Sequence, residues 1–340
     1  MQVTSEGSMK LYTEMANNQS KLLVVPTRQR RKSNYLTKGR NQVAMVSCTE
    51  RSLGIAEALK LLGGLKPLVK GVKGEIVIKP NCNTDDIYPR DTCPDTIMSI
   101  ASLLFEEGVQ PNQIVVGDMS GRARGLPTRA TMENLGIKTI AEELGIQLAY
   151  FDEEAWVKVK PEEAQYWPDG FVIPKRIYDA ERIIFTPILR SHSTATFTCA
   201  MKLGVGLIDA RSREWLHDGH DHFGKLLDIN SAFSVDMVIS DALKMNFGHG
   251  TDLKDEIEPG IIIVSDNIVA NDAVAVALMR YYKTVRVVEK STKDHEQFIH
   301  AKRLRLGAFN LNDIQLRTLD LGGSKIFPDL VEYIKAELQC

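Results

Sequence analysis

Short β-branched runs that alternate with segments of helical periodicity constrain this chain more than any other feature of its sequence. Apolar runs typical of buried strands span residues 43–47, 75–79, 113–118, 147–151, 182–187, 235–240 and 261–265. Segments with helical periodicity span residues 52–64, 94–108, 128–145, 267–282, 294–306 and 326–339, of which 128–145 holds one or two helices. This alternation predicts βαβ units and an α/β fold, with a mostly parallel sheet and helices on both of its faces.

The domain organisation follows from the length of the chain and from its first 40 residues. A length of 340 residues suits one large domain or two α/β lobes, and no low-complexity linker divides the chain. Residues 1–40 hold eight Lys or Arg and two Glu, with the run RQRRK at 28–32, and they lack a sustained apolar period. We therefore expect a poorly ordered basic segment over residues 1–40 and the α/β fold over 41–340. Residues 152–181 break the alternation and are expected to cross over the main sheet.

The charge and the cysteines argue against several classes of partner and cofactor. A net charge of −2 gives no general attraction to nucleic acid or to an anionic membrane. The sequence holds neither a signal peptide nor a run of about 20 apolar residues, so we expect a cytoplasmic protein without a membrane partner. Its five cysteines lack CxxC spacing, which argues against a disulfide framework and against an iron–sulfur cluster. The sequence leaves the oligomeric state open.

Polar side chains follow the predicted strands, at the points where the strands of a parallel sheet end side by side. These residues are Lys79 and Asn81 after 75–79, Asp118 in 113–118, Arg190 and His192 after 182–187, Asp241 after 235–240 and Asp266 after 261–265. Ligands of open α/β sheets bind beyond the carboxyl ends of the strands. The set therefore predicts a shared cleft in which these groups contact a ligand. The alternative is that each residue enters a solvated loop, because Asp and Asn are common in turns.

The segment after strand 182–187 carries a lysine among apolar and small residues. If residues 194–204 form a helix, Thr194, Thr198 and Lys202 share a narrow polar sector of an otherwise apolar surface. A lysine held there is partly desolvated, which lowers its pKa and makes it a base or an anion-binding donor. The alternative is that Lys202 extends to the surface from the helix end. His192, just before this segment, is a candidate proton donor or acceptor opposite the lysine.

Three histidines lie close together in the loop WLHDGHDHFG. His217, His220 and His222, with aspartates between them, are candidate ligands for a divalent transition metal. The alternatives are an acid–base or ligand contact by one of them, with His220 as the candidate for catalysis, and a solvated loop. His249 is flanked by glycines, which allow the backbone to approach a ligand closely. Asp272, near the start of an apolar helix, is expected to cap a helix.

The order and spacing of these motifs resemble one family. The motifs are VIKPN (77–81), VVGD (115–118), RSH (190–192), AMKLG (200–204), HDGHDH (217–222), DIN (228–230), SDAL (240–243) and SDNIVANDAVAVAL (265–278). Their series, over about residues 75–280, is similar to domain-of-unknown-function family 362, some members of which are described as iron–sulfur centre proteins. The Lys-Thr-His usual in that family stands here as RSH, and its Leu-Lys-Asn as Met-Lys-Leu. The ferredoxin-like cysteine cassettes that some members append are missing here.

A fainter similarity is to the nickel-pincer lactate racemases. In those proteins a histidine, a lysine in a small-residue helix and a second histidine follow one another in the same order. This resemblance implies that His192, Lys202 and either His217 or His220 serve in proton or hydride chemistry at a hydroxy acid.

The residues lead to two hypotheses from different classes. In the first, an enzyme of racemase-like, isomerase-like or other proton-transfer chemistry binds a small anionic organic molecule. Lys79, Arg190 and Lys202 hold the anion, and His192 with Lys202 or His220 moves protons. In the second, the chain is a metal-binding or iron–sulfur-binding module without catalysis of its own. No GxGxxG or GxxxxGK[ST] motif occurs, so no nucleotide cofactor is predicted, and a divalent metal is the cofactor that the histidines indicate.

Overall fold

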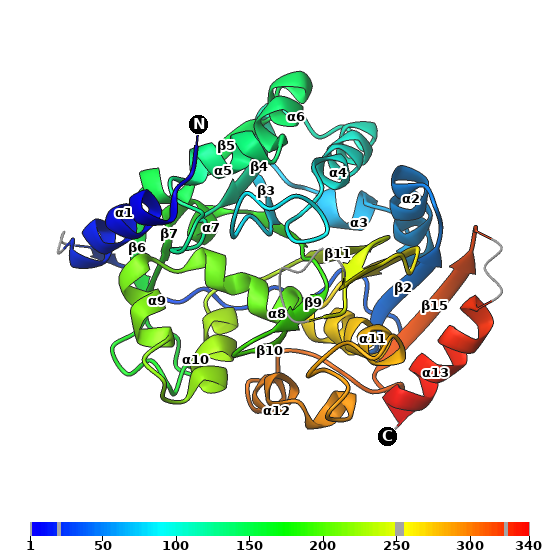
Figure 1. Cartoon of the computed structure of the whole chain (residues 1–340). Helices are drawn as coiled ribbons and strands as arrows, with labels where there is room; N and C mark the ends of the chain where they lie inside the picture. The colour runs from blue at the N-terminus through cyan, green and yellow to red at the C-terminus, as the bar shows by residue number, and fades with distance from the viewer. Residues whose placement is uncertain (1, 19–21, 249–254, 323–325, 340) are drawn as a thin grey trace.

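One eight-stranded sheet, in the order β15-β2-β14-β11-β8-β3-β4-β5, runs through the molecule (Figure 1). The computed structural model describes residues 2–18, 22–248, 255–322 and 326–339. The strands are β2 (Asn41–Ser47), β3 (Ile76–Pro80), β4 (Ile114–Asp118), β5 (Gln147–Tyr150), β8 (Arg182–Thr186), β11 (Met237–Ala242), β14 (Ile261–Ser265) and β15 (Ile314–Asp320). Neighbouring strands pair in parallel, except that β14 is antiparallel to both β2 and β11. The mostly parallel α/β sheet is therefore confirmed, and it forms one continuous sheet rather than two lobes.

Helices cover both faces of this sheet, as the alternation predicts. They include α2 (Arg51–Leu62), α3 (Lys66–Val69), α4 (Pro94–Glu106), α5 (Thr128–Asn134), α6 (Ile137–Leu144), α7 (Lys175–Asp179), α11 (Ile268–Tyr281), α12 (Glu296–Arg303) and α13 (Phe327–Gln339). Successive residues of a strand point to opposite faces. Val43 and Met45 of β2 accordingly pack in the same core as α11 and α13, whereas Ala44 and Val46 pack with α2, α4 and α6. Among the described residues, no helix is long and apolar enough to cross a membrane.

The first 40 residues are more ordered than the sequence predicts. Helix α1 (Ser5–Asn17) packs on α9 (Ala210–Leu216), and the buried Tyr12 donates a hydrogen bond to the Ala210 carbonyl at 2.9 Å. Strand β1 (Leu23–Val24) then pairs with β6 (Trp156–Val159), which pairs with β7 (Phe171–Pro174) in a small separate sheet. The described residues of this segment are held by tertiary hydrogen bonds and ion pairs and by the packing of Tyr12, Leu11 and Met15 in the main core.

Residues 194–204 do not form the single helix considered from the sequence. Strands β9 (Arg190–His192) and β10 (Thr196–Thr198) form an antiparallel hairpin, and α8 (Ala200–Leu203) has only four residues. The backbone at Thr196 has φ of 68°, which no right-handed helix accommodates. Strand β9 pairs further with β12 (Met245–Asn246), which pairs with β13 (Glu256–Ile257). Tertiary pairing therefore overrides the local helical pattern, and the shared sector of Thr194, Thr198 and Lys202 does not exist.

The basic run at 28–32 is held by one half-buried ion pair, which leads to a stability prediction. Arg31 donates from Nε and Nη2 to the Asp236 carboxylate at 2.8 and 2.6 Å, and from Nη2 to the Ser234 carbonyl at 2.8 Å. Replacing Arg31 by Ala should lower the free energy of unfolding by about 2 kcal/mol, because the half-buried Asp236 loses its charged donor. Urea denaturation measures this loss.

The Arg28→Ala variant is the matched control for that measurement. Arg28 pairs with Asp179 at 3.5 Å, and both side chains are nearly half exposed, at 47% and 46%. Exposed pairs contribute little, so this variant should lose less than about 1 kcal/mol. Equal losses in the two variants would show that the Arg31 contact does not anchor the segment.

Candidate functional site

A cavity of about 180 Å³ opens at the carboxyl ends of β3 and β4, beside the β9–β10 hairpin and α8. Seven of the residues predicted from the sequence line it. One is His217 of the histidine loop, and the other six are Lys79, Asn81, Asp118, Arg190, His192 and Lys202. They come from separate strand ends and from α8, which the parallel part of the sheet brings to one edge. The clustering is the arrangement that the strand-end pattern predicts, and the chemical role of each residue stays a prediction.

The floor of the cavity is a buried ion pair between two strand ends. Lys79 Nζ lies 2.9 Å from Asp118 Oδ1 and also donates to the Pro80 carbonyl at 2.6 Å. The other carboxylate oxygen of Asp118 accepts the Cys82 N–H at 2.9 Å. Burial raises the pKa of Asp118, and the ammonium of Lys79 opposes that shift. Each group neutralises the charge of the other in a buried setting, so this ion pair is a fixed part of the site.

Helix η3 (Gly204–Leu207) passes directly over this ion pair. A Cβ added at Gly206 would lie 2.4 Å from Asp118 Oδ1 and 2.7 Å from Lys79 Nζ, which are closer than van der Waals contacts. Only glycine therefore allows η3 to close over the pair at this distance.

Three further cations line the cavity without a carboxylate partner among the described residues. Arg190 and Lys202 are half-buried, and neither side chain has a hydrogen bond or ion pair within the described ranges. Arg213 is buried and donates to backbone carbonyls, including those of Met119 and Ser120 at 2.6 Å each. Burial lowers the pKa of Lys202 to about 7, and the nearby positive charges, above all that of Arg190, act in the same direction. The cavity thus carries an excess of positive charge.

His192 is held as a neutral imidazole with a defined tautomer. Its Nδ1 accepts hydrogen bonds from the backbone N–H groups of Thr194 at 3.2 Å and Ala195 at 3.1 Å. A neutral ring that accepts at Nδ1 carries its proton on Nε2. The charge of Lys202 and burial lower the pKa of His192 to about 2. At neutral pH this histidine therefore offers a hydrogen-bond donor to the cavity.

Helix α8, which carries Lys202, is capped from another helix. Asp272 of α11 accepts the backbone N–H groups of Ala200 at 2.9 Å and Met201 at 2.8 Å. Burial raises the pKa of Asp272 to about 6, and these hydrogen bonds act against that shift. The capping role predicted for Asp272 is found, although the capped helix is α8 and not its own. Because α8 has only one turn, this cap fixes the position of the backbone that carries Lys202.

The three histidines of residues 217–222 do not form the predicted metal-binding set. His217 lies at the mouth of the cavity with Nδ1 2.7 Å from the Arg213 carbonyl, and His222 places Nδ1 3.2 Å from the Leu216 carbonyl. His220 is exposed, between left-handed backbone at Gly219 and Asp221. Over the described ranges, no three His, Cys, Asp or Glu side chains gather in a way that could hold a metal ion.

Two other strand-end residues lie outside the cavity. Asp241 accepts from Arg51 Nε at 2.6 Å and from the Tyr88 hydroxyl at 2.7 Å, so its carboxylate is satisfied in a structural network. Asp266 lies at the opposite edge of the sheet, because β14 is antiparallel, and there it accepts the Gln42 N–H at 2.9 Å. Asp241 thus lies at the same edge of the sheet as the other strand ends but outside the cavity, whereas Asp266 is separated from them by the direction of β14. His249 lies outside the described residues.

Arg213 and Tyr12 are among the lining residues that the sequence analysis does not identify. Arg213 belongs to α9, and in the sequence it is one charged residue of an ordinary polar run. Tyr12 reaches the cavity from α1, which lies about 70 residues before the nearest other lining position. The N-cap of α9, where Asp209 accepts the Ser212 N–H at 2.9 Å, is the one local signal that marks this helix in the sequence.

Comparisons with known proteins agree with the series of motifs. The family model described as "Domain of unknown function (DUF362)" matches residues 76–277, which include β3, β4, β8, α8 and most of the cavity. The chain belongs to this family. A relative named "Thylakoid-associated protein sll1697", from Synechocystis sp. (strain ATCC 27184 / PCC 6803 / Kazusa), is 26% identical over 238 residues, 65% of this chain and 68% of the relative.

One solved structure is also similar to the whole chain. It is the lactate racemase apoprotein from Thermoanaerobacterium thermosaccharolyticum, with a TM-score of 0.38 and 12% sequence identity. The match covers 94% of this chain and 91% of that one.

The close approach of η3 to the ion pair predicts the effect of one added methyl group. The Gly206→Ala variant should lose about 1–3 kcal/mol of unfolding free energy, because the new Cβ forces η3 away from the Lys79–Asp118 pair. Gly322→Ala is the control, since a Cβ there meets its nearest atom at 3.5 Å. Thermal and urea denaturation of the two variants provide the comparison, and an unchanged Gly206→Ala protein would contradict the packing described for η3.

Proposed function

We propose that this cavity binds a small organic anion and that Lys202 exchanges a proton with it. The observation that carries the proposal is the set of three cations, Arg190, Lys202 and Arg213, that form no direct ion pair among the described residues. The charges of Asp91 and Asp118 act on Arg190 and Arg213 only at longer range. Charges removed from water are normally paired, because an isolated charge costs several kcal/mol. An anionic ligand supplies the missing negative charge.

The size of the cavity and its neutral groups narrow the class of ligand. A volume of about 180 Å³ is below the range of drug-sized pockets and suits a molecule of a few carbon atoms. Thr198 lines the cavity, and its buried hydroxyl has no hydrogen-bond partner among the described residues. His192 adds the Nε2–H donor. A carboxylate that carries a hydroxyl or carbonyl group on the neighbouring carbon would match both the cations and these two groups.

The proton chemistry follows from the pKa values. A general base or acid works best when its pKa lies near the working pH, and the pKa of Lys202 is lowered to about 7. His192 stays neutral, so its role is to donate a hydrogen bond to an oxygen on which negative charge develops. We infer a reaction in which Lys202 removes or returns a proton at the carbon next to the carboxylate, as in a racemase or isomerase.

Cytoplasmic location is part of the same proposal. Cys48, Cys82, Cys93 and Cys199 are free thiols, which suits a reducing compartment. The thylakoid-associated relative makes a membrane surface the alternative. Fractionation of cells that contain the tagged chain decides between the two locations.

The pKa of Lys202 predicts a pH dependence of anion binding. Lys202 is charged below its pKa of about 7 and neutral above it, so affinity for a small carboxylate should be highest in acid and fall as the pH rises through 7. In the Lys202→Arg variant the charge persists, and this decline should disappear. Calorimetric titration of lactate between pH 5.5 and 9 measures the effect. A flat profile in the unmodified protein would remove Lys202 from the binding site.

The proposed chemistry is tested by hydrogen exchange in deuterated water. A panel of small 2-hydroxy acids is incubated with the protein, and loss of the C2 proton, on the carbon next to the carboxylate, is followed by NMR. We expect exchange of at least one member, and a loss of at least about a hundredfold in Lys202→Met and in His192→Phe. Lys70→Met, an exposed lysine outside the cavity, is the matched control. Binding without exchange would leave an anion-binding protein, and neither binding nor exchange would refute the proposal.

A further inference from the structure

We propose that Asn81 makes the cavity around Lys202 (the Lys202 cavity) specific for a 2-hydroxy acid over the corresponding 2-oxo acid. The buried Asp91 positions Asn81 for this task. This specificity rests on the anion site proposed above, whose ligand it defines more narrowly. Asn81 directly follows β3, lines the cavity and is 8% exposed. Asp91 lies in the loop that leads from β3 to α4 and is fully buried.

The carboxamide of Asn81 has a defined orientation. Its Nδ2 donates to Asp91 Oδ1 at 2.6 Å, and the same carboxylate oxygen accepts the backbone N–H of Asn83 at 2.8 Å. A backbone N–H can only donate, so Asp91 Oδ1 presents lone pairs. The carboxamide atom that meets it must then be the nitrogen, because two acceptor oxygens would repel each other. Asp91 therefore turns the oxygen of Asn81 away from itself.

Asp91 is itself held in place and keeps this role in both of its protonation states. Its Oδ2 accepts the N–H of Thr84 at 3.3 Å and the Thr84 hydroxyl at 2.9 Å. Burial raises the pKa of Asp91 to about 7, and the charge of Arg190 opposes that shift. A proton bound near neutral pH can reside on Oδ2, because the Thr84 hydroxyl can accept it while donating to Asp86. Oδ1 then still accepts from Asn81.

The oxygen of Asn81 is free and accessible. Within the described residues, Asn81 Oδ1 accepts no hydrogen bond, yet it is not one of the buried side-chain atoms that lack a partner. It is therefore in contact with open space, and the space that Asn81 lines is the Lys202 cavity. The cavity thus contains a fixed acceptor beside its cations. Such an acceptor repels a carboxylate or keto oxygen and binds a hydroxyl group.

The donor and the acceptor in the cavity match a hydroxyl group and not a keto group. Arg190 and Lys202 attract the carboxylate of either acid. On the next carbon, a hydroxyl can accept from His192 Nε2 and donate to Asn81 Oδ1, whereas a keto oxygen can only accept. A 2-oxo acid therefore leaves Asn81 without a partner. Sites built around a substrate hydroxyl reject analogues that lack it for this reason.

The test is calorimetric titration of the full chain with lactate, pyruvate and propionate at about pH 6, where Lys202 is charged. Pyruvate has a keto oxygen in place of the hydroxyl, and propionate has neither group. We expect lactate to bind at least about tenfold tighter than the other two. In Asn81→Leu, which keeps the shape of the side chain without its acceptor, this preference should fall to within about threefold. Asn112→Leu, at an exposed asparagine outside the cavity, is the matched control and should keep the full preference.

Two variants of Asp91 test whether it positions Asn81. In Asp91→Ala the carboxamide of Asn81 is free to turn, so the preference for lactate should fall as in Asn81→Leu. Asp91→Asn keeps an oxygen that can accept from Asn81 and Asn83 while its amide nitrogen faces the Thr84 hydroxyl. It should therefore stay within about twofold of the unmodified preference. The ratio of affinities is the measured quantity, because a general loss of stability weakens all three acids alike.

Equal binding of the three acids, or a preference for lactate that persists in Asn81→Leu, would leave the anion site standing and refute the role of Asn81. A preference that survives in folded Asp91→Ala would show that Asp91 does not position Asn81. If none of the acids binds, the anion site fails, and the specificity fails with it. Melting temperatures show which variants are folded, and Asn81→Leu decides the role of Asn81 even where Asp91→Ala does not fold.

Discussion

The buried ion pair between Lys79 and Asp118 is the contact on which the rest of the Lys202 cavity depends. It joins the ends of the neighbouring strands β3 and β4, and the carboxylate of Asp118 neutralises the charge of Lys79. Helix η3 can close over it only because residue 206 is glycine. With Lys79 neutralised, the excess positive charge of the cavity falls on Arg190, Lys202 and Arg213. The ion pair thus provides a fixed floor.

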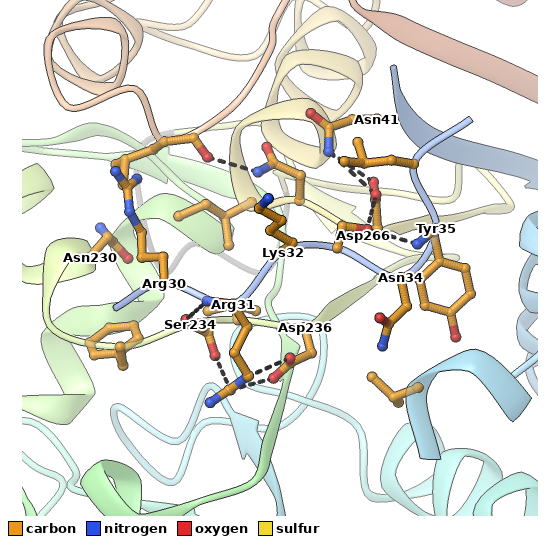
Figure 2. A pocket seen from close by; sticks show the side chains of 18 of the residues that line it. Arg30, Arg31, Lys32, Asn34, Tyr35, Asn41, Asn230, Ser234, Asp236 and Asp266 are labelled. Atoms are coloured by element: carbon orange, nitrogen blue, oxygen red, sulfur yellow. Dashed lines mark hydrogen bonds and ion pairs between the residues drawn. The ribbon is translucent and has the colours of Figure 1, made fainter. Parts of the chain in front are cut away.

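The antiparallel strand β14 determines where helix α11 begins. Because it runs against its neighbours, the helix that follows it starts at the edge of the sheet opposite the Lys202 cavity. The first residues of α11 line a cavity of about 340 Å³ at that edge (Figure 2), and one turn later Asp272 caps the helix that carries Lys202. Asn230 connects the same two regions, because its amide bonds the backbone of α8 from the far cavity. Both cavities are therefore supported by one helix.

Elements whose structure is set by neighbouring residues were predictable from the sequence, whereas those set by contacts between distant segments were not. Buried strands such as Ile261–Ser265 are apolar throughout, and their helices have regular periodicity, so both were predictable. Strand β15 was not, because it alternates charged and apolar residues at an edge. The hairpin at 190–198 has three-residue strands whose conformation comes from distant pairing partners. The direction of β14, and with it the place of Asp266, is likewise a property of the whole sheet that no local pattern encodes.

The N-terminal helix has a consequence for how such a protein can diversify. Tyr12 belongs to residues that precede the part of the chain matched by the family model, yet its side chain forms part of the cavity wall. Its helix attaches through a few contacts, including the Ser8 hydroxyl on the Arg122 carbonyl. A wall supplied by a helix from outside the matched region can change without rebuilding the sheet. The lining of the cavity can therefore vary through the leading segment alone, while the strand-end groups stay the same.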